Sequence, residues 1–321
     1  MTVEASGGPC LTPARGPGAG HEHPHGLAAR GADARALRSA AFLSAAVLVV
    51  EVVGGFLAGS LALLADAGHM ATDVGALVLS LIALRLAERA PTRARTFGWL
   101  RTEILAALAN GVTLAGISVY VAIEALRRLV EPPPVRGELM LVVASLGLLA
   151  NVVAAALLWR GRHHNLNLRG AFLHVVGDAV GSLGALGAAV LIALFGWRIA
   201  DPLVALGVSG LILVSAWRLV RESIEVLMEA TPAHVELDAL ERAMQEVPGV
   251  LGLRDLHVWT LTSGYHAMSA HVEVEGSRAP AAILERLQRV AREDFGISHT
   301  TFQLEPVGAE PAAAPAGPAR G

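Results

Sequence analysis

Six long apolar stretches constrain the fold of this sequence more than any other feature. A membrane-spanning helix needs about 20 predominantly apolar residues to cross the hydrocarbon core of a bilayer. The stretches lie at about residues 40–58, 61–86, 104–123, 139–159, 171–195 and 199–217. With 54% hydrophobic and 17% charged residues, the 321-residue chain is also too apolar for an ordinary soluble domain. We therefore expect an all-α membrane bundle of six transmembrane helices.

Ionisable side chains in the second and fifth stretches indicate a metal site. A charged group at the centre of a membrane helix costs roughly 2.5–3.5 kcal/mol on insertion scales, so it needs a partner or a water-filled cavity. Residues four apart share one helix face. Two such pairs occur, and together they offer the two imidazoles and two carboxylates that suit tetrahedral Zn²⁺: His69 with Asp73, and His174 with Asp178.

The alternative for these four residues is that they form interhelical hydrogen bonds or line a water pocket without binding metal. Two matched pairs favour metal, and the glycines around them, such as Gly68 and Gly177, permit close helix approach. The repeated pattern also predicts two related three-helix halves, with substrate at their interface near the midplane. Glu51 and Asn151 are predicted to make structural hydrogen bonds, and Asp66 to lie outside the core site.

The distribution of arginine predicts the orientation. All 25 basic residues are arginine, which excludes the lysine of a phosphate-binding ATPase loop. They gather before the first stretch, between the second and third, and between the fourth and fifth, so these sides are expected to be cytoplasmic. An even number of spans then places both termini in the cytoplasm. Arginine without lysine is typical of GC-rich bacterial genomes, and a multi-pass protein of the bacterial inner membrane is expected.

The regions before and after the apolar stretches differ from them in amino-acid composition. Residues 1–38 are rich in Pro and Gly and contain His21, His23 and His25, which predicts a disordered cytosolic tail before a membrane domain over 39–220. Residues 221–306 are more charged and predict a small α+β domain. Its elements are a helix at 236–246, a hairpin at 253–275, a helix at 280–293 and a last strand. Residues 307–321 are predicted to be a disordered tail. The single cysteine, Cys10, excludes a cysteine metal cluster.

Several motifs carry a resemblance to a known family. They are the segment from Ser60 to Met70 with Asp73, the segment from Phe97 to Ala107, Leu173-His174 with Gly177-Asp178, and the segment from Leu256 to Trp259. Over about residues 39–305 the chain resembles the cation diffusion facilitator family, particularly its zinc-transporting members of the zinc/cobalt/cadmium resistance type. The resemblance implies six transmembrane helices, a cytoplasmic ferredoxin-like domain, homodimerisation, and exchange of cytosolic Zn²⁺ for protons. It also implies that His69, where other members carry Asp, favours zinc.

The predicted activity is secondary-active efflux of Zn²⁺ from the cytoplasm in exchange for protons, by alternating access. Zinc needs neutral imidazole and ionised carboxylate, so protons and metal exclude one another at the four ligands. The expected partners are divalent metal ions, protons, the lipid bilayer and a second copy of the chain. Without a strongly basic block, nucleic acid is not an expected partner.

A second metal site is implied in the cytoplasmic domain. His257 and His271 lie on the two arms of the predicted hairpin, and His299 and Glu305 share strand parity. By resemblance to members whose cytoplasmic domain binds metal, these four residues could form a regulatory zinc site near the dimer interface. Arg254 stands where some relatives carry a ligand, which puts a full binuclear cluster in doubt.

Two other functions are compatible with a membrane protein that binds metal. An intramembrane metalloprotease would need an H-E-x-x-H helix or its equivalent and an open coordination position, and the sequence contains no H-E-x-x-H. A metal sensor that does not transport would need no acidic pairs within the membrane. The four intramembrane ligands therefore favour a transporter over an enzyme or a sensor.

Overall fold

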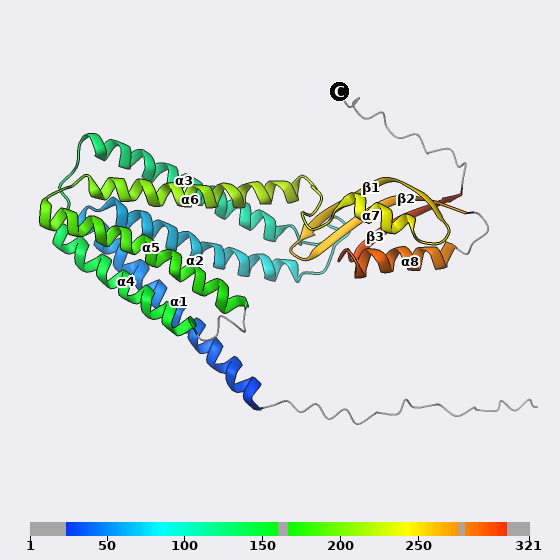
Figure 1. Cartoon of the computed structure of the whole chain (residues 1–321), viewed down its shortest axis with the longest axis horizontal. Coiled ribbons are helices and arrows are strands. Elements are labelled where there is room, and N and C mark those ends of the chain that lie inside the picture. The colour runs from blue at the N-terminus through cyan, green and yellow to red at the C-terminus, as the bar shows by residue number, and fades with distance from the viewer. Residues whose placement is uncertain (1–23, 160–165, 276–279, 307–321) are drawn as a thin grey trace, which may run out of the picture.

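The computed structural model describes residues 24–159, 166–275 and 280–306, and shows a bundle of long helices with a small α/β domain at one end (Figure 1). The bundle consists of α1 (Pro24–Ala58), α2 (Leu61–Ala87), α3 (Thr102–Val130), α4 (Gly137–Trp159), α5 (Leu166–Phe195) and α6 (Ala200–Leu227). Each of these six helices is long and apolar enough to cross a membrane. Large apolar side chains cover their outer faces, as Phe42 and Leu211 do at 77% and 70% exposed, which suits contact with lipid. The predicted six-helix membrane fold is confirmed.

The first helix corrects one prediction about the N-terminal region. α1 begins at Pro24, so residues 24–38, which we predicted to be disordered, are helical in the structure. The stretch is rich in Ala, Leu and Arg, which are strong helix formers, and proline is well tolerated at a first helical position. The tail histidines His21, His23 and His25, and also His163 and His164 between α4 and α5, lie outside the residues whose side chains the structure describes.

Small residues let the six helices pack closely. α3 runs along α6, α4 packs between α1 and α5, and α2 contacts α3 and α1. The centre of the bundle is rich in fully buried alanine, including Ala125, Ala144 and Ala189. Such side chains allow helix backbones to approach one another in a membrane, where burial of apolar surface supplies little drive.

A buried carboxylate fixes the start of α2 against α6. Asp201 Oδ1 accepts hydrogen bonds from Ser60 Oγ at 2.6 Å and from the Ala62 amide at 3.1 Å, and Asp201 Oδ2 accepts from the Leu61 amide at 2.8 Å. The first amides of a helix lack partners within the helix, and a negative charge there is favoured by the helix dipole. Asp201 is therefore a structural acid whose two oxygens are both satisfied.

The α/β domain contains α7 (Leu237–Gln245), β1 (Val250–Thr262), β2 (Tyr265–Val274), α8 (Pro280–Glu293) and β3 (His299–Pro306). The sheet has the order β1-β2-β3, with β1 antiparallel to β2 and β2 parallel to β3. Apolar side chains of both helices, such as Leu240 and Leu287, pack on the buried face of the sheet. The predicted hairpin, both helices and the final strand of a ferredoxin-like α+β domain are confirmed.

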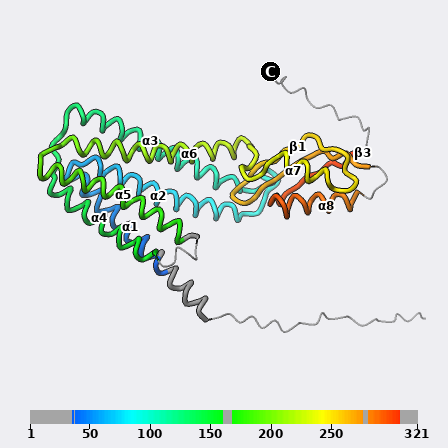
Figure 2. The backbone as a smooth tube through the Cα atoms, viewed as in Figure 1, coloured from blue at the N-terminus to red at the C-terminus, as the bar shows by residue number. Residues whose placement is uncertain are grey.

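The α/β domain contacts the bundle at the start of α3. In Figure 2 the backbone leaves α6 and passes directly into this domain. The Glu103 carboxylate accepts hydrogen bonds from Thr262 Oγ1, at the end of β1, and from Ser263 Oγ, in the turn that follows. These contacts join the hairpin to the end of the bundle. Arg101 Nη2 also donates to Glu229 Oε1, in the segment after α6, at 2.6 Å.

Candidate metal centre

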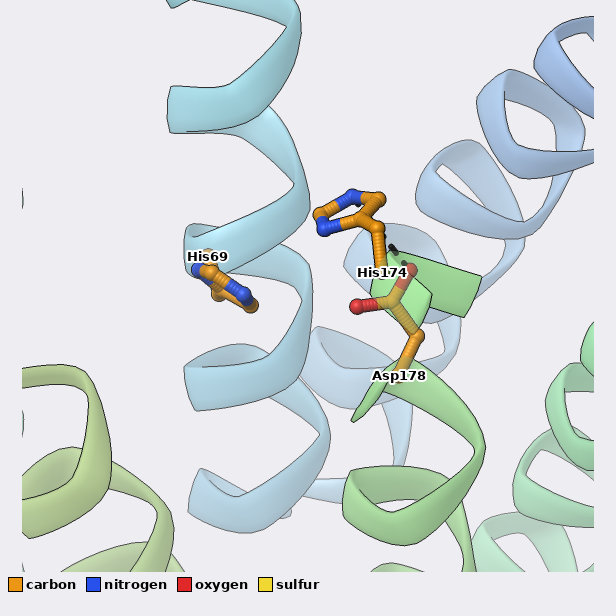
Figure 3. Close-up of side chains that lie close together, drawn as sticks. All are labelled: His69, His174 and Asp178. Carbon is orange, nitrogen blue, oxygen red and sulfur yellow. Dashed lines mark ion pairs between the residues drawn. The ribbon is translucent and has the colours of Figure 1, made fainter. Parts of the chain in front are cut away.

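The four predicted intramembrane ligands meet between α2 and α5. Asp73 Oδ2 lies 3.6 Å from His69 Nε2 and 3.5 Å from His174 Nε2, and His174 Nε2 lies 3.6 Å from Asp178 Oδ2. Figure 3 shows His174 and Asp178 on one helix, facing His69 on its neighbour. The structure therefore places both imidazoles and both carboxylates around one small space.

The spacing of the donor atoms suits a tetrahedral metal ion. With metal–ligand bonds of 2.0–2.2 Å, neighbouring ligand atoms of a tetrahedral site lie roughly 3.3–3.6 Å apart. The three ion-pair distances, 3.5–3.6 Å, agree with that separation. Ligand atoms of His69, His174 and Asp178 all lie within 4.8 Å of one another. Asp73 is not part of this three-residue group, so its side chain would have to move to bring all four ligands around one ion.

Several of these donor atoms lack partners. Among the residues that the structure describes, His69 Nδ1, Asp73 Oδ2 and Asp178 Oδ2 are buried and have no hydrogen-bond partner. Leaving a buried polar atom unpaired costs free energy, and more so when the group is charged. A bound cation or proton would remove that cost, so the cluster is built to hold one.

The site is closed on one side and open on the other. The Asp178 side chain is 2% exposed, whereas that of His174 is 46% exposed. The cluster is therefore most exposed beside His174, while Asp178 lies at its closed end.

Beyond the closed end lies a second group of polar side chains. Asn151 Nδ2 donates to Ser182 Oγ at 3.2 Å, and Ser182 Oγ donates to Asp66 Oδ2 at 3.3 Å. The structural hydrogen bond predicted for Asn151 is present. For Glu51 the prediction was wrong, because neither carboxylate oxygen has a hydrogen-bond partner among the described residues.

The structure does not bring together the four residues of the predicted cytoplasmic site. His271 Nδ1 and Glu305 Oε1 are 2.7 Å apart. His257 is exposed and lies 2.9 Å from Asp255 Oδ1, and the His299 ring packs against Phe97 at the opposite end of β3. Of the four predicted ligands, only His271 and Glu305 are in contact with each other in the described chain.

Strand register explains why the other two histidines are elsewhere. Between the pairs Arg254–His271 and His257–Ser269 the register shifts, and Asp255 adopts a positive φ of 54° there. Arg254, rather than His257, is therefore opposite His271. Parity along β3 was also a poor guide, because residues 299 and 305 are separated by about 20 Å at the rise of a strand.

A guanidinium occupies the position beside the remaining pair. Arg254 Nη2 donates to Glu305 Oε2, and Arg254 Nε lies 3.6 Å from Glu273 Oε1. Gln303 Nε2 also donates to Glu305 Oε1, at 2.8 Å. The hydrogen bond with His271, together with the contact to Arg254, lowers the pKa of Glu305 below its ordinary value.

One histidine pair was not found from the sequence. The rings of His234 and His266 lie 4.7 Å apart, and His266 Nδ1 is 3.1 Å from Thr260 Oγ1. Burial, and then the neighbouring His234, lower the pKa of His266. No spacing pattern links the two residues, because His234 lies in the segment before α7 and His266 lies in β2.

Two family models match the chain almost throughout its described length. The cation efflux transmembrane domain matches residues 37–228, and the cytoplasmic domain of the cation efflux protein matches residues 232–307. The chain belongs to the cation efflux family. The resemblance drawn from the sequence is thereby confirmed.

Relatives of this cation efflux protein carry the names of transporters. The chain is 42% identical over 287 residues to "Zinc transporter ZitB" of Escherichia coli (strain K12), covering 89% of this chain and 91% of the relative. It is 40% identical over 290 residues to "Cadmium, cobalt and zinc/H(+)-K(+) antiporter" of Bacillus velezensis, covering 89% and 92%. The prediction of a transporter rather than an enzyme agrees with these names.

A solved structure also matches part of this cation efflux protein. It is described as the metal-bound C-terminal domain of the CzcD transporter from Cuprividus metallidurans. The two are 35% identical, with 22% of this chain and 99% of that one covered and a TM-score of 0.22.

Proposed function

We propose that this cation efflux protein exports Zn²⁺ from the cytoplasm in exchange for protons, through a tetrahedral site made by His69, Asp73, His174 and Asp178. One observation carries the proposal: Asp73 Oδ2, which is buried and has no hydrogen-bond partner among the described residues, lies 3.6 Å from His69 Nε2 and 3.5 Å from His174 Nε2, the separation of tetrahedral zinc ligands. The names of the relatives, a zinc transporter and a cadmium, cobalt and zinc antiporter, support zinc as substrate.

The chemistry of the four ligands couples zinc to protons. Zinc binds neutral imidazole and ionised carboxylate, so a site that holds zinc has released its protons. When the site opens to a more acidic outside, protons compete with the metal and promote its release. The protonated ligands then return to the cytoplasmic side, where a higher pH removes the protons.

Transport requires the same site to open alternately to the two sides of the membrane. The bundle supplies two helices that each carry one histidine and one carboxylate, so a relative movement of α2 and α5 would change access without dismantling either pair. We place the end of the bundle that contacts the α/β domain, together with both termini, in the cytoplasm of a bacterial inner-membrane protein. The match to the cytoplasmic domain of the family supports this orientation.

The residues around Glu305, namely Arg254, His271 and Gln303, form what we call the cytoplasmic cluster. This cluster has a different role in the proposal. Because the Arg254 guanidinium contacts Glu305 and lies near Glu273, this cluster already contains a cation. We therefore propose that it is held by an ion pair rather than by a regulatory zinc ion. Dimerisation through the α/β domain remains part of the proposal and is supported by the family to which the chain belongs.

Zinc flux into liposomes tests the proposed function. The full chain is reconstituted with a zinc-sensitive dye, its orientation is checked by protease access, and a pH gradient is imposed. Zinc flux should rise with the gradient, vanish in Asp178→Asn, and persist in the control Glu124→Gln, whose carboxylate is already paired with Arg128 at 3.0 Å. His69→Asp should admit a wider range of metals. Absence of zinc flux from folded, oriented wild type would contradict the proposal.

A further inference from the structure

A second group of buried polar side chains lies next to the metal centre. Glu51 on α1, Asp66 on α2, Asn151 on α4 and Ser182 on α5 are each at most 3% exposed. Asp66 precedes His69 by three residues on α2 and Ser182 follows Asp178 by four on α5, so these residues lie about 4.5–6 Å further along the bundle. They are on the side of the metal centre away from the α/β domain, as the course of both helices in Figure 1 shows.

The hydrogen bonds within this group leave one carboxylate unsatisfied. Asn151 donates to Ser182, and Ser182 donates to Asp66. Glu51 is 0% exposed, yet both of its oxygens lack a hydrogen-bond partner among the described residues. A Cβ placed on Gly147 would lie 2.6 Å from Glu51 Oε1 and 3.6 Å from Ser182 Oγ. Glu51 therefore points into the same small region as Ser182.

Glycine makes room for both acids. In addition to the contact at Gly147, a Cβ on Gly181 would lie 2.9 Å from Asp66 Oδ1. Any larger residue at either position would have to displace a carboxylate or a helix. The two carboxylates thus sit directly against helix backbones, with little free space around them.

Comparison with Asp201 shows that Glu51 is not a structural acid of the same kind. Both residues are fully buried. Asp201 accepts three hydrogen bonds at the start of α2, whereas Glu51 accepts none from the described residues. Burial of an ionised carboxylate without donors is unfavourable, so Glu51 requires a cation or a proton.

The surroundings of Glu51 favour a proton. The titratable groups that face it are Asp66 on α2 and Asp178 on α5, both acidic, and α4 presents the neutral Asn151. The group contains only oxygen ligands and one amide, and lacks the nitrogen or sulfur donors that zinc prefers. A proton also needs no added space between tightly packed helices.

We propose that Glu51 and Asp66 form a proton-binding site, distinct from the four-ligand metal centre, which releases its proton when zinc binds and regains one when zinc leaves. This rests on the proposed function. Without metal, the negative charge of Asp178 favours a proton on the pair. Zinc bound at Asp178 cancels that charge, so the carboxylic O–H bond breaks, the electron pair stays on the carboxylate, and the proton passes to water. The coupling is reciprocal, as linkage requires.

Proton release on zinc binding tests this site. Zinc is added to the purified full chain in detergent, in weakly buffered solution, and bound zinc and released protons are both counted. Glu51→Gln should still bind zinc but should release about one proton fewer per zinc than wild type. Glu124→Gln, the control, should release as many as wild type. Equal proton release from Glu51→Gln and wild type would overturn the proposal.

A second variant and a spectroscopic measurement distinguish loss of the proton site from misfolding of Glu51→Gln. Asp66→Asn should show the same loss as Glu51→Gln. In infrared difference spectra, zinc should remove a protonated-carboxyl band from wild type, and this change should be absent from Glu51→Gln. If zinc flux of wild type depends on the potassium gradient as strongly as on pH, and Glu51→Gln loses that dependence, the site binds an alkali cation and the proton proposal fails. Absence of zinc flux from wild type would instead reject the proposed function itself.

Discussion

The proposed metal centre in the bundle and the cluster around Glu305 contain the same kinds of side chain but differ in the groups that contact their carboxylates. In the bundle, His69, Asp73 and Asp178 leave buried atoms without hydrogen-bond partners among the described residues. In the α/β domain, the Glu305 carboxylate is contacted by His271, Gln303 and Arg254. We therefore expect a histidine beside a carboxylate to bind metal only where no other positively charged group, such as an arginine, already contacts the carboxylate.

The largest expected effect comes from removing a carboxylate of the metal centre. Asp73 Oδ2 lies within 3.6 Å of both histidines, so Asp73→Asn removes the charge that both imidazoles face. Loss of a partner outside the ligand shell already costs about 10–100-fold in metal affinity, and loss of a ligand should cost at least the upper end of that range. Zinc titration of the purified chain measures it. The matched variant Glu305→Gln should leave this affinity unchanged, and an equal loss in both variants would remove the distinction between the two clusters.

The next effect tests whether arginine stands in for metal in the cytoplasmic cluster. Arg254→His removes the guanidinium and adds an imidazole opposite His271 and near Glu305. The zinc bound per chain after dialysis should rise from about one to about two, since the cluster then offers two imidazoles and carboxylates without a cation. The same second zinc ion in wild type would show that Arg254 does not block the site.

A smaller effect is expected at the junction between the two regions. Glu103→Ala removes the acceptor for the hydroxyl groups of Thr262 and Ser263. Each such hydrogen bond contributes roughly 1 kcal/mol, so the turn between β1 and β2 should become less protected against hydrogen exchange. Exchange measured by mass spectrometry on the full chain checks this. Arg289→Ala, which removes an exposed pair within α8, should leave exchange in the turn as in wild type.

The smallest effect concerns pH and the α/β domain. Burial lowers the pKa of His266, so the unfolded chain binds this proton more readily than the folded domain does. Stability should therefore be complete above the ordinary histidine pKa of about 6.5 and should decline as pH falls below it. Hydrogen exchange in β2, corrected for its intrinsic pH dependence, should show the decline in wild type and a weaker one in His266→Gln. The exposed-histidine variant His257→Gln should behave as wild type, and a flat wild-type profile would contradict the argument.

Most of what the sequence predicted correctly about the bundle followed from helical periodicity. Residues four apart on a helix share a face whatever the helix packs against, so His69 with Asp73 and His174 with Asp178 could be paired from the sequence. The hairpin of the α/β domain was equally legible, because alternation and a glycine turn are local signals.

The cytoplasmic cluster was not predictable, because it depends on register. A single shift near Asp255 places Arg254 rather than His257 opposite His271. The role proposed for Glu51 could not be inferred from the sequence either, since an unpartnered carboxylate can be recognised only when the neighbouring helices and their donors are known. The pair formed by His234 and His266 joins two segments that no local pattern connects.

X-ray absorption at the zinc edge, recorded on the full chain loaded with one equivalent of zinc, tests whether the proposed ligands bind the ion. We expect four nitrogen and oxygen neighbours, with two imidazoles at about 2.0–2.1 Å and carboxylate oxygens at about 2.0–2.2 Å. This signature should be lost in Asp73→Asn and kept in Glu305→Gln. A zinc ion with the same two-imidazole shell in Asp73→Asn, or one that disappears in Glu305→Gln, would contradict the assignment of the metal centre.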